Sequence, residues 1–287
     1  MEYRKLLTGD KIPALGLGTW KVGGERTPST VNDVSEVAAI KSAIEMGYTL
    51  IDTAEMYSAG HCEELIGKAI QDTVRKDLFL VSKVYRTNLQ YNKVIESCKN
   101  SLKRLGTDYL DLYLIHMPNP EVPLKETLDA MNLLVKEGLT KTIGVSAFSL
   151  EMLKEAQTKS DAPIVVNQIE YSLFARNLGY YGTSKNMESE VIPYQQKEGI
   201  ITMAVRPLER KLLLENKTVQ IIAQKYGKTP AQLCLNWLIT KEGVVAIPKS
   251  TNVVHLKENL GAFGWKIKKE DLIELDKLKE IDNFRRP

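Results

Sequence analysis

The sequence has few of the residues from which metal centres and disulfide frameworks are built. Its 287 residues include three histidines and three cysteines, and the cysteines are Cys62, Cys98 and Cys234. Their odd number and their lack of metal-ligand spacing argue against a disulfide scaffold or a zinc site. Three histidines are also too few for the histidine clusters of metal-dependent hydrolases. We therefore expect no metal and a reducing, cytoplasmic environment.

The sequence also lacks long apolar runs and an excess of charge of one sign. Nothing approaches membrane-spanning length, and the first ten residues hold no apolar stretch long enough for export. The 39 Lys and Arg residues are interspersed with 36 Asp and Glu residues, which gives no electrostatic footprint for nucleic acid. We expect a globular monomer or small homo-oligomer with neither a membrane nor a nucleic acid as partner.

Short apolar runs alternate with amphipathic stretches along the whole chain, a pattern typical of parallel βαβ units. Eight runs rich in Val, Ile, Leu and Tyr are predicted as strands that are buried on both faces. They cover residues 15–19, 49–52, 78–84, 109–115, 142–145, 164–168, 200–204 and 244–247. An apolar spacing near 3.6 predicts helices over 33–46, 63–71, 91–105, 124–136, 150–159, 189–197, 219–226, 230–240, 257–262 and 270–279.

Two α/β architectures fit this alternation, a closed barrel and an open doubly wound sheet. An open sheet that binds a dinucleotide would carry G-x-G-x-x-G after its first strand, whereas residues 16–21 (GLGTWK) lack the third glycine. A barrel closes as one domain at about 250 residues. We therefore predict that residues 1–287 form a single (β/α)₈ TIM barrel with two extra helices, and that residues 3–12 form an N-terminal β-hairpin that covers its bottom.

Ionisable residues stand at the ends of three successive predicted strands. Asp52, Lys83 and His116 lie at or just past the ends of the second, third and fourth strands. The carboxyl ends of the strands in a parallel barrel converge on one face, where catalytic residues collect. Taken singly, these residues could be a helix cap, a solvated strand end and a loop residue. Pairing Asp52 with Lys83 would offset the cost of burying either charge, so we expect one site that also includes the nearby Tyr57.

These four side chains suit proton transfer to a carbonyl oxygen. An ordinary phenol has a pKa of about 10, and a nearby ammonium lowers it by roughly 1 to 3 units. Tyr57 beside Lys83 could then give a proton to a developing alkoxide and take it back in the reverse reaction. Asp52 would hold Lys83, while His116 would donate a hydrogen bond to the carbonyl oxygen. No side chain supplies hydride, so we predict a nicotinamide cofactor.

Three segments resemble the aldo-keto reductase family, and the resemblance extends from residue 9 almost to the end of the chain. Residues 51–57 (IDTAEMY) resemble the family's Asp and Tyr signature, residues 81–84 its lysine strand, and residues 108–116 its histidine strand. The resemblance implies an NADPH-dependent oxidoreductase that reversibly reduces aldehydes and ketones to alcohols. It implies that Asp52, Tyr57, Lys83 and His116 are catalytic and that the small-molecule carbonyl or alcohol substrate contacts Trp20, Tyr57, His116 and Met117.

The resemblance also implies a binding site for NADPH or NADP⁺. Ser146 and Gln168 would hold the nicotinamide carboxamide, and Lys249 with Ser250 would hold the 2′-phosphate. The full set of implied cofactor contacts comprises Gly18, Thr19, Asp52, Ser146, Gln168, Leu208, Lys249, Ser250, His255, Glu258 and Asn259.

Three positions of this cofactor site depart from the family pattern. Ala147 stands in place of an Asn, Val205 in place of an aromatic residue that stacks on the nicotinamide, and His255 in place of an Arg. Tyr171 and Tyr180 are the candidates to replace the stacking ring, and His255 leaves use of NADH open beside NADPH. The alternative function is that of a non-catalytic NADPH-binding barrel, a sensor or regulatory subunit. A damaged catalytic group would favour that alternative, and here all four residues are present.

Overall fold

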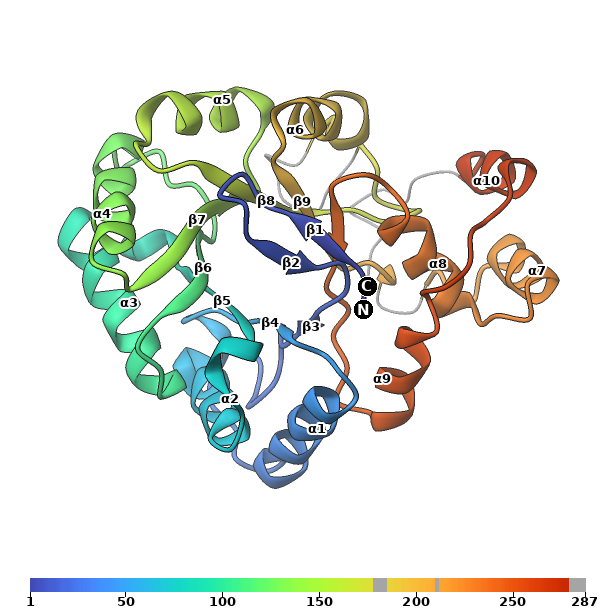
Figure 1. Ribbon diagram of the computed structural model, residues 1–287, viewed down its shortest axis with the longest axis horizontal. Coiled ribbons are helices and arrows are strands. Elements are labelled where there is room, and N and C mark those ends of the chain that lie inside the picture. The colour runs from blue at the N-terminus through green and yellow to red at the C-terminus, as the bar shows by residue number, and fades with distance from the viewer. Residues whose placement is uncertain (178–184, 210–211, 279–287) are drawn as a thin grey trace.

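The centre of the molecule is a parallel sheet that curls into a ring (Figure 1). The computed structural model describes residues 1–177, 185–209 and 212–278. Within them the strands follow one another around the sheet in chain order, each hydrogen-bonded to the next. They are β3 (Leu17–Gly18), β4 (Leu50–Asp52), β5 (Phe79–Val84), β6 (Leu110–Ile115), β7 (Thr140–Ser146), β8 (Ile164–Glu170), β9 (Ile201–Val205) and β10 (Val244–Ala246).

The first and last strands of this sheet meet and close it. Leu15 pairs with Ala246 and Gly18 with Lys249, both in parallel orientation. The second contact needs a residue without a side chain, because a Cβ on Gly18 would lie 2.7 Å from the carbonyl oxygen of Ile247. The predicted barrel is therefore confirmed over the open sheet.

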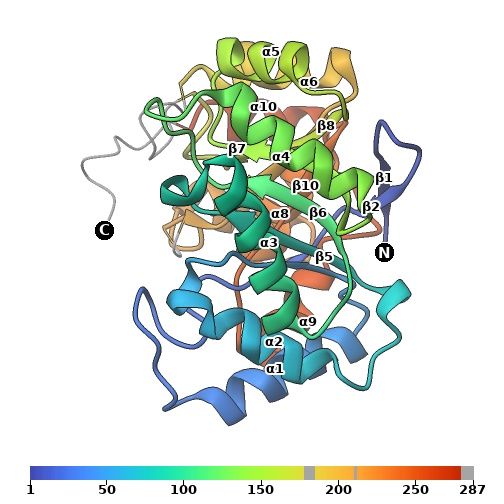
Figure 2. The ribbon, with the colours of Figure 1, turned by 90° about the vertical axis from the view of Figure 1, so that its left-hand side faces the viewer.

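The barrel interior is apolar and is sealed at one end by the N-terminal hairpin. Strands β1 (Tyr3–Lys5) and β2 (Lys11–Pro13) pair antiparallel, as predicted, and lie across the end of the ring that faces the viewer in Figure 1 and that is on the right in Figure 2. Leu6 and Ile12 from this hairpin join the same apolar cluster as the interior side chains of the strands. Those side chains include Leu50, Phe79, Val81, Leu112, Leu114, Val166, Ile201, Met203, Val245 and Ile247. The carboxyl ends of the strands lie at the opposite end of the barrel, which the hairpin does not cover.

Helices surround the sheet and bury a second, larger apolar layer against its outer face (Figure 1). They are α1 (Asp33–Glu45), α2 (His61–Ile70), α3 (Tyr91–Leu105), α4 (Leu124–Lys136), α5 (Leu150–Lys159), α6 (Ile192–Glu198), α7 (Lys217–Lys225), α8 (Pro230–Ile239), α9 (Val253–Leu260) and α10 (Lys269–Asp276). In the described part of the chain, none of these helices combines the length and the apolar character that crossing a membrane requires.

Helix starts account for the main differences from the predicted boundaries. Helix α9 begins four residues earlier than predicted, because the side chain of Asn252 accepts a hydrogen bond from the Val254 N–H and caps it. Helix α6 is preceded by a π-helical turn, Met187–Val191, so the predicted helix over 189–197 spans two elements. Helix α8 starts as predicted, with Thr229 and Gln232 forming a capping box.

Candidate active site

A buried ion pair lies at the carboxyl end of the barrel strands. The Nζ atom of Lys83 donates to Asp52 Oδ1 and to the carbonyl oxygen of Thr53, both at 2.7 Å, and lies 3.3 Å from the hydroxyl oxygen of Tyr57. Lys83 has no exposed surface and Asp52 is 2% exposed. Three of the four predicted catalytic side chains are thus joined in one hydrogen-bonded group.

Strand alternation explains why these polar side chains share one space. Successive side chains of a strand point to opposite faces, so every second residue lies on the same face. Leu50 and Val81 lie in the interior cluster, and Asp52 and Lys83 follow them by two residues. The polar group is therefore the layer directly above the apolar interior.

Burial and the neighbouring carboxylate have opposite effects on the pKa of Lys83. Loss of water around the ammonium lowers the pKa of Lys83, and Asp52 offsets part of this effect. Asp52 is held in turn by Gln168, whose Nε2 donates to Asp52 Oδ2 at 2.8 Å. Both carboxylate oxygens therefore have a donor, as a buried charge requires. The sequence assigned Gln168 to the cofactor and gave no sign of this bond to a residue 116 positions away.

His116 completes the group and is uncharged. Burial, and after it the charge of Lys83, lowers the pKa of His116 well below its ordinary value. Its Nδ1 atom is buried and has no hydrogen-bond partner in the described residues. A buried N–H without an acceptor is costly, so the neutral ring favours the tautomer with its proton on Nε2. This tautomer supplies the donor that the predicted role of His116 needs.

A row of rings lines the mouth of the barrel. The Trp20 and Tyr57 ring centroids are 5.0 Å apart, those of Tyr57 and His116 are 5.7 Å apart, and those of His116 and Tyr85 are 5.9 Å apart. All three contacts are edge-to-face, an arrangement that aromatic rings prefer. The prediction missed Tyr85, although its place two residues after Lys83 is a usable signal. Met117, predicted beside the substrate, is half-buried directly after His116.

Closure of the barrel brings together predicted cofactor segments from the two ends of the chain. Gly18 lies beside Lys249 through the parallel bridge between them. The Gly18 N–H donates to the Pro248 carbonyl oxygen at 3.0 Å, and the Thr19 hydroxyl donates to the Asp52 carbonyl oxygen at 2.8 Å. The first of these segments is therefore fixed to both β4 and the residues after β10.

The remaining predicted cofactor contacts lie at strand ends and on α9. Ser146 is buried at the end of β7, in register with Gln168 on β8. Leu208 is half-buried and packs on the outer apolar cluster. Lys249 is exposed and Ser250 is half-buried. On α9, His255 is exposed, Glu258 is half-buried and Asn259 is buried.

Tyr171, one of the two candidates for the stacking ring, packs on the outer side of the barrel. It follows β8, and the interior side chain of Gln168 places Tyr171 on the opposite face of that strand. Its ring packs against Trp237 on α8 at 5.3 Å, and its hydroxyl donates to Glu188. Tyr171 therefore faces away from the barrel interior, while Tyr180 lies outside the described residues.

An ion pair between Arg206 and Glu170 adjoins Val205. Val205 packs against the interior cluster and pairs with Glu170 across β8 and β9. Arg206, with a φ of 52°, places a guanidinium nitrogen 3.0 Å from Glu170 Oε1. Position 205 therefore presents an aliphatic side chain beside this buried pair, where the family pattern has an aromatic ring.

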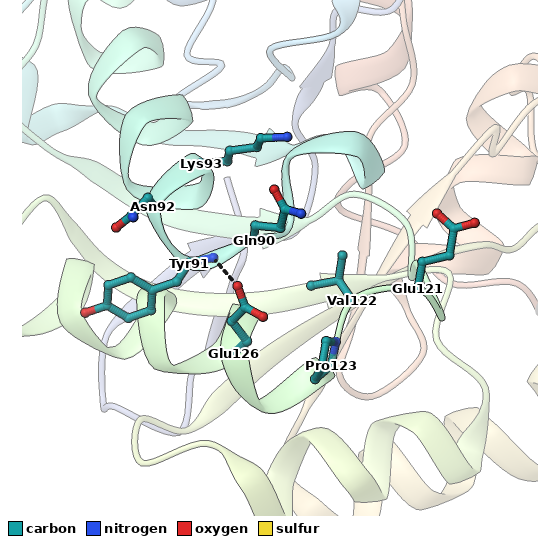
Figure 3. A pocket seen from close by; sticks show the side chains of 8 residues that line it. All are labelled: Gln90, Tyr91, Asn92, Lys93, Glu121, Val122, Pro123 and Glu126. Carbon is teal, nitrogen blue, oxygen red and sulfur yellow. Dashed lines mark hydrogen bonds between the residues drawn. The ribbon is translucent and has the colours of Figure 1, made fainter.

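A separate hollow of about 410 Å³ lies between the first turns of α3 and α4 (Figure 3). A carboxylate oxygen of Glu126 accepts the backbone N–H of Tyr91 there at 2.9 Å. None of the four predicted catalytic residues lines this hollow.

The family of the chain follows from comparison with known proteins. The sequence profile of the aldo/keto reductase family matches residues 14–280. The chain belongs to the aldo/keto reductase family. The matched region contains the barrel strands and all four residues of the group around Lys83. The predicted family, barrel fold and enzyme class, an oxidoreductase that acts on carbonyl compounds, are confirmed.

Named relatives in this family span nearly the whole chain. The methylglyoxal reductase YeaE of Escherichia coli is 36% identical over 277 residues, which cover 94% of this chain and 92% of that protein. The glyoxal reductase of Bacillus subtilis is 35% identical, and the match covers 96% of this chain and 91% of that protein. Among solved structures, a thermostable aldo-keto reductase with the inhibitor epalrestat superimposes with a TM-score of 0.91 at 49% identity, covering 96% and 99%. An aldo/keto reductase of Klebsiella pneumoniae with NADP and acetate superimposes with a TM-score of 0.85 at 35% identity, and the match covers 96% of this chain and 94% of that chain.

Proposed function

We propose that this aldo/keto reductase reduces small aldehydes and ketones with NADPH and that Tyr57 is its proton donor. The observation that carries the proposal is the 3.3 Å contact between the Tyr57 hydroxyl and the buried ammonium of Lys83. A positive charge at that distance favours the phenolate over the neutral phenol. Tyr57 then gives its proton to the carbonyl oxygen, and Lys83 stabilises the phenolate that remains.

The other residues of the group orient the reactants. Asp52 keeps Lys83 in place, and Gln168 keeps Asp52 in place. The neutral His116 donates from Nε2 to the carbonyl oxygen and so stabilises the negative charge that develops there. A nicotinamide bound at this site would supply the hydride that the carbonyl carbon accepts.

The donor set near β10 fits a phosphorylated dinucleotide. The ammonium of Lys249 and the hydroxyl of Ser250 are side chains that bind phosphate, and the bridge to Gly18 places them beside the barrel mouth. The complexes of Klebsiella pneumoniae relatives with NADP and with NADPH support this choice of cofactor. We propose that Lys249 and Ser250 hold the 2′-phosphate, and that use of NADH is the lesser activity.

Small dicarbonyl compounds are the proposed substrate class. The relatives named methylglyoxal reductase and glyoxal reductase, which cover most of this chain, support it. The half-buried rings of Trp20 and Tyr85 give the mouth an apolar wall against which a short carbonyl compound can pack.

The test compares Tyr57→Phe with the wild-type protein on methylglyoxal, following the loss of NADPH absorbance. We expect Tyr57→Phe to abolish turnover and to leave NADPH binding, measured by fluorescence, unchanged. Tyr3→Phe is the matched control, because Tyr3 is an exposed tyrosine on the opposite end of the barrel. Full activity of Tyr57→Phe would remove the proposed acid. NADPH binding without turnover of any carbonyl compound by the wild-type protein would favour a sensor or regulatory barrel instead.

A further inference from the structure

A left-handed turn directly follows the proposed proton donor. Ser58 has φ 50° and ψ 37°, Ala59 has φ 52° and ψ 38°, and Gly60 has φ 94°. Two of these three residues carry a Cβ, which makes the left-handed region unfavourable. Such a conformation persists where surrounding contacts impose it, and it clusters at functional sites. The contacts that impose this conformation are made by Ser58 and Gly60, close to Tyr57.

Ser58 binds the loop that follows β3. Its hydroxyl oxygen lies 2.8 Å from the carbonyl oxygens of both Val22 and Gly24, and its N–H donates to the carbonyl oxygen of Glu25. A hydroxyl has one hydrogen, so the two carbonyl groups share it. Ser58 has no exposed surface. Three carbonyl groups of one short loop therefore converge on a single buried residue.

That loop also carries the ring that faces Tyr57. The Val22 N–H donates to the carbonyl oxygen of Thr19, and the Gly23 N–H donates to the buried carboxylate of Glu36. The turn between these bonds contains Trp20, whose ring centroid is 5.0 Å from that of Tyr57. Ser58, the residue after Tyr57, is thus hydrogen-bonded to Val22, which lies two residues after Trp20.

The other end of the turn is tied to the strand of Lys83. A Cβ on Gly60 would lie 2.8 Å from the side chain of Arg104, so the glycine permits Arg104 to pack on the turn. Arg104 donates to Glu63 at 2.6 Å, and Glu63 accepts from the hydroxyl of Ser82 at 2.5 Å. Ser82 immediately precedes Lys83 on β5. The turn therefore connects the loop of Trp20 to the strand of Lys83.

We propose that Ser58 is a positioning residue whose hydroxyl holds the Tyr57 phenol between Trp20 and Lys83. This inference rests on the proposed role of Tyr57 in proton transfer. Without the hydroxyl, the backbone at position 58 relaxes out of the left-handed region and Tyr57 moves away from Nζ of Lys83. A displacement of about 1 Å in an active site can lower the rate about 100-fold.

Ser58→Ala tests the proposal, because alanine keeps the Cβ and loses the hydroxyl. We expect kcat to fall at least about tenfold, with KM for the carbonyl substrate and Kd for NADPH within about twofold of wild type. Ser58→Gly also loses the hydroxyl but adopts the left-handed region freely, so it should retain a higher kcat than Ser58→Ala. Ser35→Ala is the control, because Ser35 is exposed and its hydroxyl donates to the carbonyl oxygen of Asn32, the residue before α1.

A second readout does not depend on turnover. Titration of the protein by ultraviolet absorbance reports phenolate formation, and the difference between wild type and Tyr57→Phe isolates the Tyr57 step. In Ser58→Ala this step should move to higher pH, because the phenol is farther from the ammonium. An unchanged kcat and an unchanged titration in Ser58→Ala would overturn the proposal, and so would a kcat of Ser58→Gly below that of Ser58→Ala. A wild-type protein that turns over no carbonyl compound would refute the proposed function, while the titration would still decide the role of Ser58.

Discussion

The Asp52–Lys83 pair should behave as one energetic unit, and a double-mutant cycle measures this. Lys83→Met replaces the ammonium with an apolar group of similar length and leaves the carboxylate of Asp52 buried beside Gln168. Removing one partner of a buried ion pair typically costs about 3–5 kcal/mol. Asp52→Asn should cost about as much, because it leaves a fully buried ammonium with only neutral partners, the Thr53 carbonyl and the Tyr57 hydroxyl.

The double variant should be more stable than either single variant. It leaves no buried charge, and replacing a buried pair by neutral side chains of similar volume is often close to neutral. If the single costs sum to about 6–10 kcal/mol and the double costs about 0–3 kcal/mol, the coupling energy is at least about 3 kcal/mol. Urea unfolding followed by circular dichroism gives the four free energies of unfolding that the cycle needs.

An exposed pair provides the matched control. Lys159 and Glu155 lie one helical turn apart on α5, 2.6 Å from each other, and their side chains are more than 40% exposed. Such pairs contribute about 0.3–0.5 kcal/mol, so this cycle should be nearly additive. Additive costs within about 0.5 kcal/mol at Asp52 and Lys83 would refute the reasoning, because they would mean that the two charges do not stabilise each other.

The pH dependence of one single variant gives an independent check. Burial lowers the pKa of Lys83, and Asp52 counteracts this, so Asp52→Asn lowers it further. Between that lowered value and the ordinary value of 10.5, the unfolded chain binds more protons than the folded chain. Stability therefore rises with pH in this window. The cost of Asp52→Asn should shrink as the solution becomes alkaline, and a cost that grows would contradict the assignment.

Two further predictions concern the segment around the left-handed turn. A hydrogen bond to Glu64, together with the Asp33 carboxylate, raises the pKa of His61. The resulting stabilisation is complete below the ordinary pKa of about 6.5 and is lost as the pH rises through the pKa of the folded state. His61→Gln should therefore cost more stability at about pH 5.5 than at about pH 9, and equal changes in the urea midpoint at the two pH values would contradict this. Ala59 is exposed and has φ 52°, so Ala59→Gly should raise the free energy of unfolding by about 0.5–1 kcal/mol. Ala38→Gly, on the exposed face of α1, is the control and should lower it by about 1 kcal/mol. A destabilised Ala59→Gly variant would argue against backbone strain at this turn.

The order of elements and the catalytic group were predictable because both follow from short-range patterns. The buried strands read as apolar runs, and the chain order of strands is the order around the barrel. A polar residue two positions after an interior apolar residue must lie on the same face. Asp52 after Leu50 and Lys83 after Val81 satisfy this rule in the structure. The sequence predicts the same mouth for both side chains because they stand at the carboxyl ends of neighbouring predicted strands.

Contacts between distant segments could not be predicted in the same way. The bond from Gln168 to Asp52 crosses the barrel interior, and nothing in either local sequence distinguishes it from a contact to a ligand. The left-handed turn after Tyr57 is also invisible in the sequence, because Ser and Ala do not favour that region. Tertiary contacts to the loop after β3 impose the conformation of Ser58, and these exist only once β3 and β4 pair.

The departures from the family pattern fall in the predicted cofactor site and leave the proposed proton-transfer group unchanged. Ala147, Val205 and His255 all belong to the predicted cofactor site, where binding energy is distributed over many contacts. Losing one hydrogen bond to a charged group costs about 1.5–3 kcal/mol, which weakens binding by roughly one to two orders of magnitude. In the proposed mechanism, proton transfer has no such redundancy, because one phenol would donate and one ammonium would stabilise the phenolate. An intact group around Lys83 with an altered cofactor site therefore predicts a reductase that keeps its proton-transfer group and binds its cofactor with a different affinity from that of family members that follow the pattern.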